Sequence, residues 1–262
     1  MKVADLQRKL PIGELGEPLH YFDTIGSTND HAKQLAGEGA PHGTLVLADE
    51  QTAGRGRWQR SWHTPAGSAL ALSLVLRLPA LDPDRVPSLN ALGALAVSRA
   101  LDEYGTPSQI KWPNDVLLSG KKVAGILVEA GWQEDLLDYV VIGIGVNVLP
   151  ESVPPVKELS FPATSVQQEV KQPIQRDALL IGILQQLDAW LGRLDSGELL
   201  EAWNNRLAYK GQQVQLLGRE DQIQGRLLEV MADGRLVLEV DSQRQAVGED
   251  FVQLRQVDRN SR

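Results

Sequence analysis

The chain has 262 residues, with 26 Lys and Arg against 34 Asp and Glu, a net charge of −8, and no cysteine. An acidic balance argues against a general nucleic-acid binder, and the missing cysteines exclude disulfides, thiolate nucleophiles and cysteine metal sites. Charges interrupt the N-terminal segment, and no apolar run reaches the ~18 residues of a membrane span. We therefore expect a cytoplasmic protein that does not enter membranes.

The first predicted element is a helix over residues 27–36. Ser27 and Asp30 form a capping-box pattern, and glycines follow at the expected end of the helix. A short β-rich run at 44–48 comes next. Leucines then stand at every second position from 70 to 78, which predicts a strand with five leucines on one face.

A helix is predicted from Ser88, its expected N-cap, to Gly105, because leucines recur there at helical spacing. Three strands are predicted after it, at 109–112, 122–131 and 137–148. Short turns join these strands, which indicates an antiparallel or mixed sheet.

The C-terminal third changes character twice. Residues 150–162 are rich in proline and predict a loop, and amphipathic helices are predicted across 180–194 and 198–209. Short alternating strands follow from Gly211, separated by predicted turns at 218–221, 233–234 and 248–250, and this composition is typical of a small β-barrel.

A domain boundary is therefore predicted near Tyr209. Residues 1–209 would form the catalytic domain and residues 210–262 the barrel. Acidic and basic residues nearly balance in the second part, so it is not a basic nucleic-acid module. The four histidines of the chain lack metal-ligand spacing, and we expect no protein-bound zinc.

Three arginines, Arg55, Arg57 and Arg60, lie on a loop with glycines at 54 and 56. Glycine lets a backbone approach a ligand closely, and arginine offers a planar fork to carboxylate or phosphate. The loop therefore predicts a site for a small anion. A solvated surface turn would have the same composition.

A second polar cluster follows the strand that ends at Trp112. Pro113 favours an extended conformation before it, so Asn114 and Asp115 are expected at the strand end. Asn114 could reach phosphate or ribose, and Asp115 could bind Mg²⁺ indirectly or orient an amine. An ordinary Asn-Asp turn is the alternative.

Lys122 opens an apolar strand, where it is either a gatekeeper charge or a cation for an α-phosphate. Residues 143–147 end another apolar strand with two glycines and an asparagine, which permits close backbone approach to a ligand. The chain has no Walker-type phosphate loop, no complete GxGxxG fingerprint and no GxSxG elbow. ATP, if used, is held by another scaffold.

Taken together, these motifs resemble those of the biotin protein ligases over about residues 20 to 150. The residues that carry the resemblance are Ser27-Thr28-Asn29, Gln51, Gly54 to Arg57, Trp62, Lys111 to Asp115, Lys122 with Gly125, and Gly143 to Asn147. Several motifs in this order and spacing are far more specific than any one of them.

The resemblance implies an α/β (α+β) fold: a mixed-sheet catalytic domain similar to class II aminoacyl-tRNA synthetases, followed by an SH3-like barrel. It implies that biotin and MgATP form biotinyl-5′-AMP and pyrophosphate. A lysine on the biotin carboxyl carrier protein or domain of acetyl-CoA carboxylase, or of another biotin-dependent carboxylase, then displaces AMP.

The resemblance also implies roles for individual residues. Lys122, Arg57 and Asp115 would be catalytic, with no metal ligand specific to the protein and with Mg²⁺ entering on ATP near Asp115. Biotin would be bound by Ser27, Thr28, Gln51, Arg55 (through its backbone), Arg57, Lys122 and Gly125. ATP would be bound by Arg57, Arg60, Trp62, Asn114, Lys122 and Asn147, with Trp62 packing on adenine.

Two departures from the family pattern stand out. Gln59 occupies a position where the family often has a second glycine. Only about twenty residues precede the first motif, so we expect a short form without the DNA-binding domain of some members, and no DNA partner. Either a monomer or a homodimer is compatible with the sequence.

Two other functions compete with biotin ligation. A lipoate or octanoate ligase would use the same scaffold, but the chain lacks that family's triple glycine and Arg-Arg pair. A non-catalytic biotin or adenylate sensor would keep the binding residues. The presence of both Lys122 and Asp115 favours an enzyme.

Overall fold

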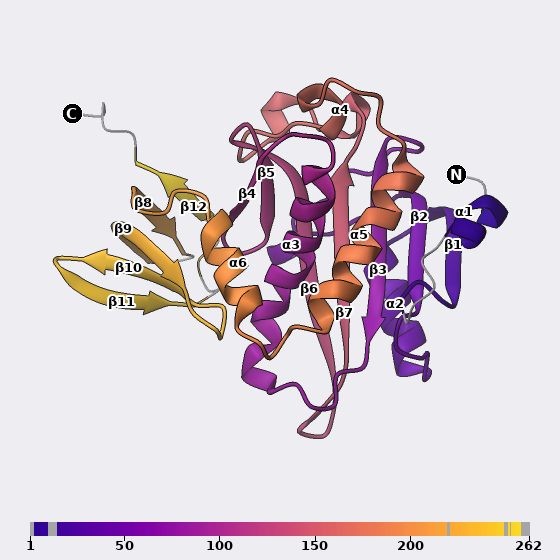
Figure 1. Cartoon of the computed structure of the whole chain (residues 1–262), viewed down its shortest axis with the longest axis horizontal. Helices are drawn as coiled ribbons and strands as arrows, with labels where there is room; N and C mark the ends of the chain where they lie inside the picture. The colour runs from indigo at the N-terminus through magenta and orange to yellow at the C-terminus, as the bar shows by residue number, and fades with distance from the viewer. Residues whose placement is uncertain (1–2, 10–14, 219–220, 249–250, 252, 258–262) are drawn as a thin grey trace.

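A seven-stranded sheet forms the centre of the larger part of the molecule (Figure 1). The structure is a computed structural model that describes residues 3–9, 15–218, 221–248, 251 and 253–257. The strand order is β1-β2-β3-β7-β6-β5-β4; β1 and β2 are parallel and the other neighbours antiparallel. The prediction of a mixed sheet is confirmed. The strands are β1 (Leu19–Ile25), β2 (Leu45–Gln51), β3 (Ala69–Leu76), β4 (Ser108–Lys111), β5 (Asp115–Leu118), β6 (Lys121–Gln133) and β7 (Leu136–Asn147).

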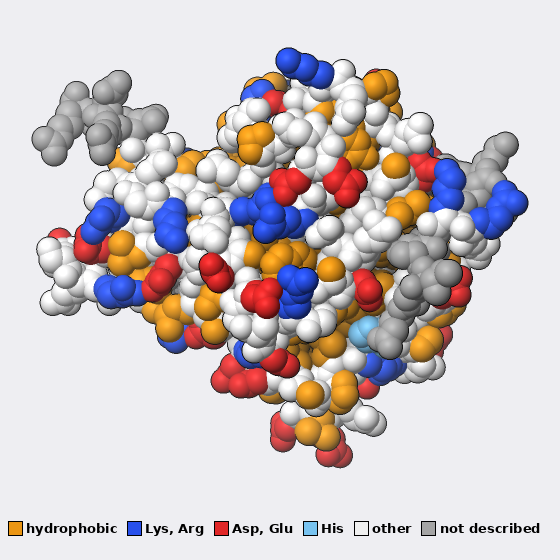
Figure 2. All heavy atoms as spheres, in the orientation of Figure 1, with side chains coloured by type: hydrophobic (Ala, Val, Ile, Leu, Met, Phe, Trp, Pro, Cys, Tyr) orange, Lys and Arg blue, Asp and Glu red, His pale blue; other side chains and the backbone are white. Residues whose placement is uncertain are grey.

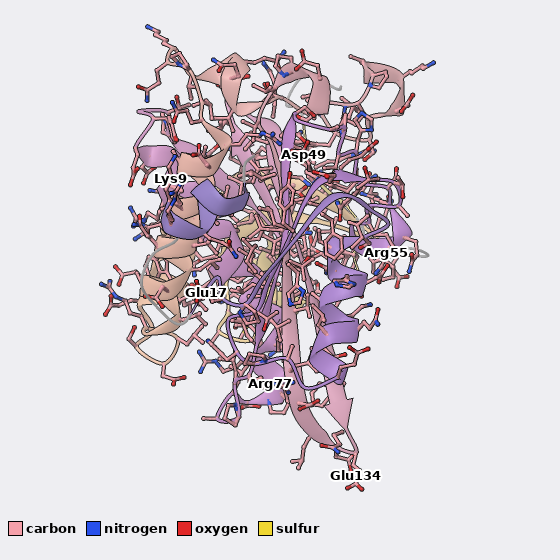
Figure 3. The ribbon with its side chains drawn as sticks, turned by 90° about the vertical axis from the view of Figure 1, so that its right-hand side faces the viewer. Lys9, Glu17, Asp49, Arg55, Arg77 and Glu134 are labelled. Carbon is pink, nitrogen blue, oxygen red and sulfur yellow. The ribbon has the colours of Figure 1, made fainter. Side chains whose placement is uncertain are left out.

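Helices cover both faces of this sheet. Helix α2 (Thr28–Gly37) packs on one face, while α3 (Leu89–Asp102) and α5 (Arg176–Leu191) pack on the other. Figure 3 shows this layering from the side, with Arg55 at one end of α2 and Arg77 at the level of the other. The remaining helices are α1 (Val3–Lys9), α4 (Val166–Glu169) and α6 (Glu198–Arg206).

Strand β3 is buried along its whole length. Its leucines at 70, 72, 74 and 76 belong to the main core, while Val75 packs in a small cluster with Ala32 and Ala36 of α2. The predicted leucine face is therefore confirmed over 70–76. Leu78 lies beyond the end of the strand.

Three details of the sequence prediction were wrong or incomplete. Strand β1 was not predicted, because its pattern mixes polar and apolar residues without a clear period. Strand β5 was also missed, because it is four residues long and begins directly after the turn of residues 112–114. Ser88 is the N-cap residue of α3 as predicted, but its side chain makes no capping bond: its hydroxyl donates to Arg85 O (2.7 Å) in the 3-10 turn Pro83–Ser88.

A second, antiparallel sheet of five strands lies beside the first, in the order β11-β10-β9-β8-β12, and is consistent with an SH3-like barrel. Trp112 joins the two sheets, because its Nε1 donates to Gly234 O (2.8 Å). The boundary near Tyr209 falls between α6 and this sheet and stays a prediction. Parts of the predicted turns at 218–221 and 248–250 lie outside the described residues. The strands are β8 (Gln213–Leu217), β9 (Gln222–Val230), β10 (Leu236–Val240), β11 (Gln243–Val247) and β12 (Gln253–Gln256).

Hydrophobic side chains remain exposed where the β6–β7 hairpin projects from the molecule. Trp132 is 50% exposed and Leu136 74%. Figure 2 shows hydrophobic and acidic side chains together at this tip. Among the described helices, none is long and apolar enough to cross a membrane.

Candidate active site

One cavity of about 610 Å³ brings the predicted site residues together. Its walls come from the first turn of α2, the arginine loop, the turn between β4 and β5, strands β6 and β7, and the proline-rich segment. Cavities of ~300 to 1,000 Å³ typically hold small molecules. The predicted residues that line it are Ser27, Thr28, Gln51, Arg55, Arg57, Arg60, Trp62, Asn114, Asp115, Lys122, Gly125 and Asn147.

At one end of the cavity the polar groups are neutral. Ser27 caps α2 by accepting a hydrogen bond from the backbone N–H of Asp30. Gln51 Oε1 accepts from Thr28 N (2.8 Å) and Thr28 Oγ1 (3.0 Å), and its Nε2 donates to Thr64 Oγ1 (3.2 Å). Helix α2 and strand β2 are thus joined by side chains that can also donate to a ligand or accept from it.

The side chain of Arg55 turns toward α2. Its guanidinium pairs with Asp30 and lies 3.6 Å from Glu129 Oε2. Asp30 therefore does not complete a reciprocal capping box; its carboxylate pairs with Arg55 and with Lys33 (3.4 Å). Because protein carboxylates occupy the Arg55 fork, its backbone is the part best suited to contact a ligand.

At the other end of the cavity two lysines share one carboxylate. Lys122 Nζ lies 2.5 Å from Asp115 Oδ1, and Lys111 Nζ lies 3.6 Å from Asp115 Oδ2. The Lys111 ammonium also lies 4.7 Å from the centre of the Phe161 ring. Antiparallel pairing of β5 with β4 and β6 brings the three charged residues together.

The buried position of this cluster changes the pKa of its members. Burial lowers the pKa of Lys111; nearby Asp115 partly offsets this effect, and Lys122 adds to it. For Asp115, burial alone would raise the pKa, but attraction to Lys122 and Lys111 outweighs burial, so the pKa of Asp115 lies below its usual range. Asp115 is therefore ionised at neutral pH.

The backbone of Lys122 is held from one side by the proline-rich segment. Lys122 N donates to Pro162 O (2.8 Å), and Thr164 N donates to Lys122 O (2.9 Å). Asn147 Nδ2 donates to Thr164 O (3.1 Å), which ties the end of β7 to the same segment. The predicted loop thus forms a strand-like wall beside Lys122.

Two paired glycines leave room for Trp62. Gly125 on β6 and Gly145 on β7 are register partners, and a Cβ at Gly145 would lie 2.3 Å from the Trp62 ring. Lys122 Nζ lies 5.3 Å from the centre of the same ring. Beside them, Asn114 Nδ2 donates to Ile126 O (2.6 Å) and orients the β4–β5 turn. Adenine packing on Trp62 stays a prediction.

The arginine loop contains a tight turn. Trp58 and Gln59 have φ of 59° and 57°, in the left-handed region that favours glycine. Gly56 N donates to Arg60 O (2.7 Å), which closes the turn. Glycine would adopt this backbone conformation more readily than the Gln59 of this chain does.

Several residues of the cavity wall were not predicted. Strand β12 contributes Gln253, Leu254 and Arg255, and Phe251 lies just before it. Nothing local in these residues indicates a site, since the contact depends on how the second sheet packs against the first. Asn29 was noted only as part of a motif, yet it is 4% exposed and lines the cavity. Groups of three or more metal-ligating side chains are absent from the described part of the chain.

Comparisons with known proteins identify the family of the chain. Residues 21–147 match the model of the biotin/lipoate A/B protein ligase family. The chain is 44% identical in sequence to the bifunctional ligase/repressor BirA of Bacillus subtilis over 173 residues, and this match covers 65% of the chain. The chain spans about half the length of that relative, 52%.

Two other matches cover more of the relative's own length. A biotin–[acetyl-CoA-carboxylase] ligase of Paracoccus denitrificans is 37% identical, over 72% of this chain and 80% of the relative. A solved structure of the biotin protein ligase from Aquifex aeolicus, in complex with biotin and ATP, matches this chain with a TM-score of 0.77 and 28% sequence identity. The match covers 92% of this chain and 100% of that one. The resemblance seen in the sequence is confirmed: the chain belongs to the biotin protein ligases of the biotin/lipoate A/B family.

Proposed function

We propose that this protein activates biotin with ATP and transfers it to a lysine of a carrier protein. The observation that carries the proposal is that a single cavity has a neutral, hydrogen-bonding end at Thr28 and Gln51 and a charged end at Lys122 and Asp115. A ring with amide-like groups suits the first end, and reacting anions suit the second. The Aquifex relative binds biotin and ATP, which supports the pairing of these ligands.

In the first step, a carboxylate oxygen of biotin attacks the α-phosphorus of ATP. The bond between that phosphorus and the bridging oxygen breaks, so biotinyl-5′-AMP and pyrophosphate form. Both reactants are anions and repel each other. Lys122 and Arg57, which line the same cavity, would offset this repulsion and stabilise the charge that builds up in the transition state.

In the second step, a lysine amine of the carrier attacks the carbonyl carbon of the adenylate. The bond from that carbon to the AMP oxygen breaks, AMP leaves, and the amine loses a proton. Asp115 is the group suited to orient the amine, because its lowered pKa keeps it ionised, it lines the cavity, and its Oδ1 can accept once Lys122 has turned from it to the phosphate.

Mg²⁺ is the ordinary partner of ATP, but Asp115 does not fit a role as its ligand in this arrangement. Both carboxylate oxygens of Asp115 face lysine ammonium groups, at 2.5 and 3.6 Å. A metal entering with ATP would be held by the phosphate oxygens.

The neutral end favours biotin over lipoate. The dithiolane ring of lipoate neither donates hydrogen bonds nor accepts strong ones, so the hydrogen-bonding capacity that Ser27, Thr28 and Gln51 have left for a ligand would go unused. Unpaired polar groups in a site discriminate strongly against an analogue that cannot bond to them. The ureido group of biotin offers both donors and an acceptor.

The test is biotin-dependent exchange of pyrophosphate into ATP, followed by detection of biotin on a purified carboxyl carrier domain. We expect exchange with biotin and labelling of the carrier lysine. Exchange with lipoate alone would show a lipoate ligase, and tight biotin binding without exchange would show a sensor. The carrier as acceptor, the absence of a DNA partner, the oligomeric state and the cytoplasmic location remain predictions.

A further inference from the structure

Ser73 lies in the middle of β3, and neither the family resemblance nor the cavity wall assigns it a role. Its side chain is 0% exposed. Ser73 Oγ lies 2.5 Å from Asn29 Oδ1 and 2.8 Å from Thr28 Oγ1, so its hydroxyl contacts two successive residues in the first turn of α2. A buried hydroxyl in an otherwise apolar strand is costly unless it is bonded, and the single hydrogen of this one is shared between two acceptor oxygens.

The orientation of the Asn29 amide is fixed by its other contacts. Asn29 Nδ2 donates to Glu129 Oε2 (2.9 Å) and to Leu127 O (3.3 Å), and both oxygens can only accept. The amide oxygen of Asn29 must therefore face Ser73. Since an amide oxygen can only accept, Ser73 supplies the hydrogen of that bond.

The sheet is shaped to receive Asn29 at this point. The register partner of Ser73 on β7 is Gly143. A Cβ on Gly143 would lie 2.0 Å from Asn29 Oδ1, so any larger residue would displace the amide. Gly143 thus leaves room for the Asn29 amide, and the neighbouring Ser73 bonds to its oxygen.

The far end of this chain of contacts is anchored by charge. Glu129 accepts from Lys33 Nζ (2.6 Å) and lies 3.6 Å from the Arg55 guanidinium. Arg55, which is labelled beside α2 in Figure 3, belongs to the arginine loop. The path from β3 through α2 therefore ends on the same loop that borders the cavity.

The near end of the path reaches the ligand-facing residues. Thr28 donates twice to Gln51, and both residues line the cavity. Thr28 is thus held by two residues: Ser73 on β3 and Gln51 at the end of β2. Displacing Thr28 by a fraction of an ångström would misdirect the hydrogen-bonding groups at the neutral end.

We propose that Ser73 is a positioning residue for the ring end of the biotin ligand. By holding Asn29 and Thr28 against the sheet, it fixes the directions in which Thr28 and Gln51 present their donors and acceptors. The identity of the ligand rests on the proposed function. The positioning itself rests only on the contacts among these residues.

The kinetic test compares Ser73→Ala with Ser98→Ala. Ser98 is a matched control, because it is also 0% exposed and hydrogen-bonded, to Ser108 Oγ (2.6 Å), but lies on α3 across the sheet. We expect Ser73→Ala to raise the KM for biotin about tenfold or more, with kcat and the KM for ATP within about twofold of wild type, because a buried oxygen loses its donor. Ser98→Ala should change neither KM. An equal rise of both KM values in Ser73→Ala, or no rise, would overturn the proposal.

A second measurement needs no ligand. The Thr28 backbone N–H is bonded to Gln51, and its hydrogen exchange reports how firmly the first turn is held. We expect exchange at Thr28 to be about tenfold faster in Ser73→Ala than in Ser98→Ala. Equal exchange rates would contradict the positioning role, whatever the substrate proves to be.

The two measurements separate the two proposals. Absence of biotin-dependent exchange in the wild-type protein would reject the proposed function, while the Thr28 exchange rate would still decide the role of Ser73. If Ser73→Ala does not fold, Ser73→Cys replaces it. Its thiol is close in size but a weak donor, so the same changes are expected.

Discussion

The two ends of the cavity hold their side chains by different means. At the neutral end, Thr28, Gln51 and Ser73 are fixed by short hydrogen bonds between uncharged groups. At the charged end, Lys122 and Lys111 are fixed by attraction to Asp115. Hydrogen bonds depend steeply on distance and angle, whereas charge attraction falls off slowly.

Because of this difference, we expect substitutions at the two ends of the cavity to have different effects. The neutral end should tolerate few changes of position, and its defects should appear in the binding of the acid. The charged end should tolerate small shifts but not the loss of a charge, and its defects should appear in the chemical step. Four substitutions test this division.

Lys122→Ala should have the largest effect, because it removes the cation that we propose stabilises the transition state of the first step. We expect biotin-dependent pyrophosphate exchange to fall by about 10²–10³-fold, or about 3 to 4 kcal/mol of transition-state stabilisation. Lys121→Ala is the control, since Lys121 pairs with Glu169 (3.1 Å) and is half exposed. Near-normal exchange in Lys122→Ala would remove Lys122 from the chemistry and break the comparison.

Asp115→Asn should lower the free energy of unfolding by about 3 kcal/mol at pH 7, because it leaves the buried Lys111 and the partly buried Lys122 without their counter-charge. The pKa of Asp115 is lowered by folding, so its stabilisation is complete above its ordinary pKa of about 4 and is lost as the pH falls through the folded-state value. Urea unfolding should therefore show a constant gap to wild type above about pH 5 that closes in acid.

Asp195→Asn is the matched control for that experiment. Asp195 also pairs with a basic side chain, that of Arg85 at 2.6 Å, but the side chain of Asp195 is 89% exposed. An exposed pair contributes about 1 kcal/mol or less. If both variants lost the same stability, the Asp115 cluster would be no more than a surface ion pair.

Gly143→Ala should disturb the neutral end alone. Its added Cβ would meet Asn29 Oδ1, so we expect the KM for biotin to rise about tenfold while kcat changes little. Gly182→Ala in α5 is the control, since its Cβ would lie at an ordinary 3.5 Å from Ala100. A fall in kcat with unchanged KM for biotin would show that the two ends are not separate.

Arg57→Gly should have the smallest effect of the four. The loop loses a cation and gains backbone freedom, so we expect biotinyl-5′-AMP to dissociate several-fold faster, or about 1 kcal/mol. Stopped-flow release of the adenylate measures this rate. An unchanged rate would show that the loop closes without Arg57, and Arg57→Lys would separate charge from flexibility.

Sequence reasoning named Asp115 and Lys122, and Lys111 only as part of a motif; the three lie close together in the structure because they are within twelve positions on neighbouring strands. Local spacing is informative when short turns bring residues together. The strong alternation in β3 also predicted a central strand. Strand β5 escaped notice because four residues give too few periods to recognise.

The neutral end was harder to predict. Ser73 contacts residues 44 and 45 positions away, and the Glu129 that completes its path lies a hundred positions from Asn29. A serine inside an apolar strand carries no local signal of its partners. The same holds for β12, which reaches the cavity only because the second sheet packs against Trp112.

The sharing of one carboxylate by two lysines has a consequence for how Lys122 can act. If Asp115 had a single lysine, moving that lysine toward an incoming phosphate would leave a buried anion without compensation. Lys111 stays behind, so Asp115 keeps a partner while Lys122 changes its own. Because the Lys122 backbone is bonded to the neighbouring segment, this exchange requires only rotation of the side chain. Lys111 thus allows Lys122 to leave Asp115 and bind the phosphate.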